Sequence, residues 1–134
     1  MPDLPLRPLD AGFHDASTSD PLEGVWVVRT AEELHTLWRR AMSGHRPEPV
    51  LPPVDWAAEM VVVFVLGVRG TGGHAAHVER VRADGGVLRV FVREQRPGTG
   101  VTTQALSNPF HVVAVPRQED LPLEVVRRVE VVDR

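Results

Sequence analysis

Histidine is the first residue type here that could do chemistry, because a neutral imidazole binds metal ions and exchanges protons near neutral pH. His74, His77 and His111 fall on or beside predicted strands and could gather on neighbouring strands. However, His74 and His77 have opposite parity, so a regular strand turns them to opposite faces unless a bulge intervenes. No His-x-His or His-x-x-x-His spacing strengthens the set. We therefore expect ordinary hydrogen-bonded histidines and no metal site.

Nucleophilic residues and pairs of acidic residues give weaker indications of a catalytic site. Ser107 lies four residues before His111, but a catalytic Ser–His pair depends on spatial geometry that this spacing does not supply. A Gly-x-Ser-x-Gly elbow is absent. Asp55 and Glu59 are interpreted as a helix cap and a surface residue. The sequence contains no Cys and no Lys, which excludes thiolate chemistry and Lys-based catalysis. We expect no enzyme activity and no cofactor.

Two loops are rich in Gly and polar residues. The segment 67–74 resembles a phosphate cradle, but such loops need a following helix N-terminus, and here a strand follows. It is better interpreted as a tight connection with several positive-φ residues, or as a loop kept free of side chains for a partner's backbone. The segment 96–104 is unusually long for a compact domain. The polar side chains of this loop either stabilise its own backbone or bind a partner, and both interpretations stay open.

Composition limits the class of protein. With 134 residues, 43% of them hydrophobic, the chain is predicted to form a single domain over 1–134. The formal charge of −3 argues against nucleic acid and anionic membranes as partners. The Pro-rich start does not resemble a signal peptide, and the longest apolar run, 60–66, is too short to span a bilayer. We expect a soluble cytoplasmic protein, with an exported mature fragment as the alternative.

Valine-rich runs bounded by Gly and Pro predict seven strands. One helix begins at the capping box Thr30–Glu33, carries apolar residues at helical spacing, and is expected to end at Ser43–Gly44. The predicted fold is α+β: a curved, mostly antiparallel sheet or open barrel of about six or seven strands with one main helix. The predicted strands are Leu4–Phe13, Glu23–Arg29, Met60–Val68, His74–Arg82, Val87–Gln95, Phe110–Pro116 and Glu124–Val132.

An ordered set of short motifs gives a resemblance. They are R-x-A-E-E-L-x-x-L-W at 29–38, P-P-V-D-W at 52–56, E-M-V-V-V-F-x-L-G at 59–67, T-G-G-H at 71–74, R-P-G at 96–98 and T-Q-A-L-S-N-P-F-H-V-V-A-V-P at 103–116. From about Leu6 to Pro116 the chain resembles the C-terminal domain family of the protease complex subunit PrcB. His74 and Phe110 stand where members commonly have an aromatic residue such as Tyr, and Val101 stands near a position where many have Cys.

The resemblance implies a non-catalytic, protein-binding domain that stabilises or assembles a partner, with a protease as the candidate. The alternatives are a small-ligand-binding or metal-dependent hydrolytic domain that uses His74, Gln104 and His111, and a homodimer formed by pairing of edge strands. The motif residues either form a binding surface near two converging loops or hold the fold. The predicted binding residues are Thr71, Gly72, Gly73, His74, Pro97, Gly98, Thr103, Gln104, Pro109 and His111.

Overall fold

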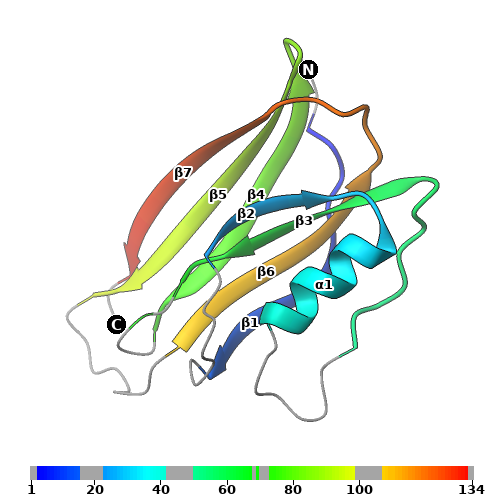
Figure 1. The fold of residues 1–134 in the computed structure, drawn as a ribbon. Coiled ribbons are helices and arrows are strands. Elements are labelled where there is room, and N and C mark those ends of the chain that lie inside the picture. The colour runs from blue at the N-terminus through cyan, green and yellow to red at the C-terminus, as the bar shows by residue number, and fades with distance from the viewer. Residues whose placement is uncertain are drawn as a thin grey trace.

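The structure is a computed structural model, which describes residues 3–15, 23–41, 50–67, 69, 73–98 and 107–132. Within these ranges it has seven strands and one helix (Figure 1). The elements are β1 (Arg7–Asp15), β2 (Gly24–Val28), α1 (Ala31–Ala41), β3 (Glu59–Val65), β4 (Ala75–Asp84), β5 (Val87–Pro97), β6 (Ser107–Pro116) and β7 (Leu123–Val132).

The described strands divide between two sheets. The first has the order β1-β6-β3-β2 and is antiparallel throughout; the second has the order β4-β5-β7, in which β5 and β7 are parallel. The predicted α+β class and strand number are confirmed. The pairing is mostly antiparallel, as predicted, but the described strands form two stacked sheets instead of one continuous curved sheet or open barrel.

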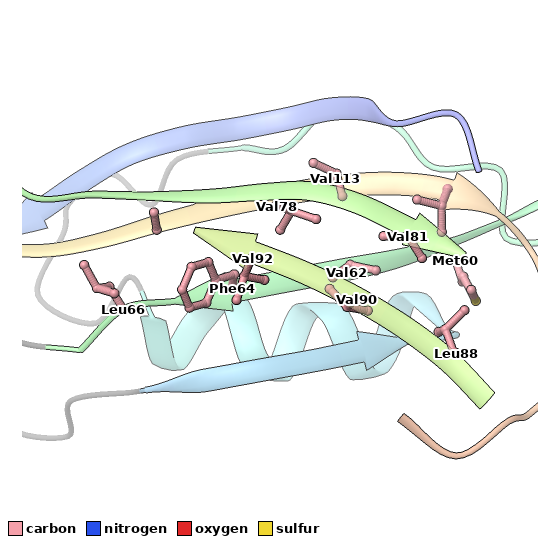
Figure 2. Packing of buried hydrophobic residues seen from close by; sticks show 12 residues of the cluster. Met60, Val62, Phe64, Leu66, Val78, Val81, Leu88, Val90, Val92 and Val113 are labelled. Carbon is pink, nitrogen blue, oxygen red and sulfur yellow. The ribbon is translucent and has the colours of Figure 1, made fainter. Parts of the chain in front are cut away.

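The first sheet is the middle layer of three. One face packs on α1, where Trp38 and Phe110 meet edge to face with their ring centroids 5.6 Å apart. The other face packs on the second sheet (Figure 2), with Met60, Phe64 and Val113 meeting side chains of β4 and β5. This arrangement explains why the run 60–66 is apolar at every position: β3 is covered on both faces.

Local sequence signals account for the helix and the tight turns. The amide of Glu33 donates to Thr30 Oγ1 at 3.1 Å, so the predicted capping box forms. The predicted helix end at 43–44 lies outside the described residues. The hairpin between β4 and β5 turns at Gly85 and Gly86, with φ of +61° and +82°, values that glycine adopts without strain. No helix in the described part of the chain is long and apolar enough to cross a membrane.

A β-bulge changes which face of β4 its side chains point to. Its register against β5 shifts between Val78 and Arg80, so Val78 and Val81 both point into the layer between the sheets (Figure 2). His77 precedes the bulge and pairs with Arg93. The bulge therefore does not bring His77 to the face on which Val78 lies.

Candidate functional site

A buried carboxylate with three arginine partners lies near the end of β5. Glu94 is 1% exposed and belongs to the inner face of the second sheet, in phase with Leu88, Val90 and Val92. Arg96 Nε donates to it at 3.0 Å and Arg69 Nη2 at 3.2 Å. Arg127 Nη2 makes a short hydrogen bond to the other carboxylate oxygen. These arginines come from β5, β7 and the segment after β3, so one carboxylate ties three parts of the fold together.

The arginines keep Glu94 ionised. Burial acts to raise the pKa of Glu94, because a charged carboxylate loses hydration in the interior. The hydrogen bonds from Arg96 and Arg127, together with the charge of Arg69, outweigh burial and lower that pKa to about 2. The carboxylate is therefore charged at every physiological pH, and the cluster of four side chains has more positive than negative groups.

The same cluster reaches the surface beside β5 and β7. The side chains of Arg96 and Arg127 are 52% and 40% exposed. The guanidinium of Arg127 also lies over the ring of Phe64, 5.8 Å from its centroid, so it reaches from the second sheet to the first. We call Arg69, Arg96, Arg127 and Glu94 the arginine cluster.

The strand beside this cluster, β7, is exposed along nearly its whole length. It forms the edge of the second sheet and contacts β5 on one side (Figure 1). The register pairs its odd-numbered residues with the inward-facing residues of β5, so they share the inner face. Apolar exposed side chains on that face are Leu123, Val125, Val129 and Val131, which are 41%, 41%, 45% and 62% exposed. An exposed apolar edge of this length is a template for pairing with another chain.

Two backbone hydrogen bonds fix which groups of β7 face outward. The amide of Leu88 donates to the carbonyl of Pro122, and that of Gly98 donates to the carbonyl of Val132, both at 2.8 Å. In a parallel ladder, alternate residues bond to the same neighbour. The even-numbered residues of β7 therefore bond to β5. The N–H and C=O groups of Val125 and its odd-numbered neighbours point away from the sheet.

On the outer face of the second sheet, in contrast to the arginine cluster, most charged side chains are paired with side chains of opposite charge. Arg89 Nε donates to Glu124 at 3.0 Å, and Arg93 contacts both Glu79 and Glu130 at 3.2 Å. Arg128 likewise contacts Glu79 and Glu130. Arg80 instead lies over the ring of Phe91, and Arg82 pairs with Asp3. What distinguishes the arginine cluster is its buried carboxylate, which three arginines share.

The predicted binding residues do not all lie together. His74 lies near the arginine cluster. Burial, and then the charge of the nearby Arg69, lower the pKa of His74. Pro97 and Gly98 follow Arg96 directly, and the Gly98 amide bonds to β7. Pro109 is buried in β6, where its carbonyl accepts from Leu66 at 2.8 Å. Gly73 precedes His74 and has a φ of +87°. The predicted residues Thr71, Gly72, Thr103 and Gln104 lie outside the described residues.

The backbone conformation at Gly73 favours glycine, whether or not this residue also contacts a partner. Side chains strain a backbone with φ near +87°, so a substitution at Gly73 perturbs the loop whatever it does to binding. This agrees with the interpretation of the segment 67–74 as a tight connection with positive-φ residues. Gly67, with a φ of +95°, is the other described example in that segment.

His111 joins the two sheets. Its Nδ1 accepts a hydrogen bond from the amide of Val78 at 2.8 Å, so it satisfies a group on the edge of β4 that does not pair with β5. Its ring lies 6.3 Å from that of His77, centroid to centroid. His74 has other neighbours, in the arginine cluster. In the described part of the chain, no group of three or more His, Asp or Glu residues could hold a metal ion.

Acidification should weaken the fold through His111. Burial lowers its pKa, as does the nearby His77, so the folded state takes up a proton less readily than the unfolded chain. Its contribution to stability is full above pH ~6.5 and is lost as the pH falls from there through the lowered folded pKa. We expect His111→Gln to reduce the change in unfolding free energy between pH 7.5 and pH 5.5, as measured by urea titration. An unchanged difference would contradict this role.

Sequence reasoning missed the arginine cluster, although one signal for it was present. The alternation of Leu88, Val90 and Val92 continues to Glu94, so the pattern places a carboxylate on the buried face. A buried carboxylate requires cationic or hydrogen-bonding partners. The partners Arg69 and Arg127 come from distant segments, and no periodicity in the sequence brings them together.

A comparison with protein-family models supports the resemblance inferred from the motifs. The family model described as PrcB C-terminal matches residues 60–116, from β3 through β6 and less than half of the chain. No curated protein and no solved structure matches this chain. The helix α1 and the strand β7 lie outside the matched range. Over residues 60–116 this chain is therefore similar to the PrcB C-terminal family.

Proposed function

We propose that this chain is a non-catalytic protein-interaction domain that stabilises or assembles a partner protein through the free edge of β7. A protease is the candidate class of partner, as the family resemblance implies. One observation carries the proposal: a ten-residue edge strand whose odd-numbered backbone groups and apolar side chains are open to another chain.

Strand addition is the physical mechanism that fits this edge. An extended segment of the partner would pair with the outward N–H and C=O groups of β7, while its alternate side chains cover the exposed valines. A partner that is bound only in its native state is stabilised by mass action, because binding removes native molecules from the unfolding equilibrium. The domain would thus protect its partner without doing chemistry on it.

Photo-crosslinking in the source cells tests the proposal. A benzoylphenylalanine placed at Val129 on β7 is expected to crosslink a near-stoichiometric partner protein, which mass spectrometry would identify. The matched control is the same group at Val50, which is 93% exposed but lies outside the strands. Equal crosslinking at both positions, or none at Val129, would contradict a partner on β7.

A further inference from the structure

The inner face of β7 combines apolar and basic character within one short strand. Val125 and Val129 flank Arg127 on this face, and Arg96 of β5 pairs with Val131. A segment added at the free edge would place alternate side chains beside these residues. Most of its inward positions would meet valine, and one position near the middle would meet arginine.

The two exposed arginines, Arg96 and Arg127, have N–H groups with which they can bind a second carboxylate. A guanidinium has five N–H donors, and the described contacts of Arg96 and Arg127 with Glu94 each use a single nitrogen. Both side chains are also about half exposed, so an incoming group can approach them. A carboxylate that binds here forms charge-assisted hydrogen bonds, which are stronger than neutral ones.

We propose that the segment bound by β7 is an extended acidic–apolar peptide, with one Asp or Glu directed at Arg96 and Arg127 and apolar side chains two residues to either side. This inference rests on the proposed function and names the kind of sequence that the partner supplies. Charge complementarity supports this choice of peptide, because the inner face offers cations at one inward position and apolar side chains at the others.

A second copy of β7 fits this edge less well. In both copies the odd-numbered residues direct their backbone groups outward, so antiparallel pairing aligns odd residues with odd residues. The side chains facing Arg127 would then come from Leu123, Val125, Arg127, Val129 or Val131 of the second copy. None of these is acidic. The carboxylates of Glu124 and Glu130 would face the opposite side.

A pair of blocked, fluorescein-labelled peptides tests the inference by fluorescence anisotropy on the full chain. The probe is Thr-Val-Thr-Val-Thr-Glu-Thr-Val-Thr, and its matched partner has Gln in place of Glu. We expect the Glu peptide to bind about tenfold more tightly, the effect of one charge-assisted pair. Arg96→Gln should reduce this ratio to about twofold. Arg80→Gln, on the outer face over Phe91, should leave it unchanged.

The outcomes separate this inference from the proposed function. Equal binding of the two peptides overturns the acidic preference and leaves strand addition in place. Failure of both peptides, with crosslinking at Val129 still present, overturns the peptide class while the protein-binding function stands. Light scattering that shows a dimer, converted to a monomer by Val125→Pro, overturns the inference in favour of a second copy.

Discussion

Replacing Glu94 with Gln should lower the free energy of unfolding by about 3 kcal/mol, as measured by urea denaturation at pH 7. The substitution removes a buried negative charge and leaves Arg69, Arg96 and Arg127 around a neutral amide. The size follows from the lowering of the Glu94 pKa from 4.5 to about 2, because each pKa unit corresponds to ~1.4 kcal/mol.

Glu124→Gln is the matched control. Glu124 also pairs with an arginine, Arg89, but its side chain is 49% exposed. Exposed ion pairs contribute little, so we expect this variant to lose much less stability than Glu94→Gln. Similar small losses in both variants would contradict a buried, charge-dependent role for Glu94.

The acid response of the Glu94 variant provides an independent measurement. Because the folded pKa of Glu94 is lower than the unfolded value, its contribution to stability is complete above pH ~4.5. That contribution is lost as the pH falls from there towards about 2. Other carboxylates such as Glu59 and Glu79 also have lowered pKa values, so the wild type loses stability for several reasons. We expect the loss to be smaller in Glu94→Gln than in the wild type.

Blocking the free edge of β7 should abolish partner binding and spare the fold. Val125→Pro removes an N–H that points away from the sheet, which an edge strand tolerates. A partner strand would lose that hydrogen bond and meet the proline ring, so we expect at least a tenfold loss of affinity for the crosslinked partner. Circular dichroism and thermal unfolding should show a folded protein.

Two further variants control for this substitution. Val126→Pro removes an N–H that bonds to β5, so it should destabilise the protein by roughly 3 kcal/mol. Val125→Ser keeps the backbone donor and removes apolar surface, so it should weaken binding less than proline does. If proline destabilises the protein equally at 125 and 126, the assignment of outward groups on β7 is wrong.

The local structure was predictable because it depends on neighbours in the sequence. The capping box formed at Thr30, and the apolar run that begins at Met60 lies in one of the predicted strands and is buried on both faces. The turn at Gly85–Gly86 lies between two of the predicted strands, and its backbone conformation favours glycine. Each of these features uses contacts within a few residues, or a burial pattern that the strand itself displays.

The division into two sheets and the exposed edge of β7 were not predictable in the same way. The alternation of β5 does not say whether its partners are parallel, and the parallel neighbour β7 follows β5 by way of the whole of β6. The valine-rich run at 123–132 predicts a strand but not its burial, and in the structure it is nearly all exposed. Pairing choices of this kind depend on tertiary packing, which one sequence pattern does not contain.

Hydrogen exchange on β7, read residue by residue by NMR, tests the central claim most directly. In the free protein, the amides of Val126 and Arg128 bond to β5 and should exchange slowly, whereas those of Val125, Arg127 and Val129 point outward and should exchange fast. Addition of the crosslinked partner, or of the Glu peptide, is expected to protect the outward amides. Protection confined to other elements, with Val125, Arg127 and Val129 still exchanging fast, would contradict binding at this edge.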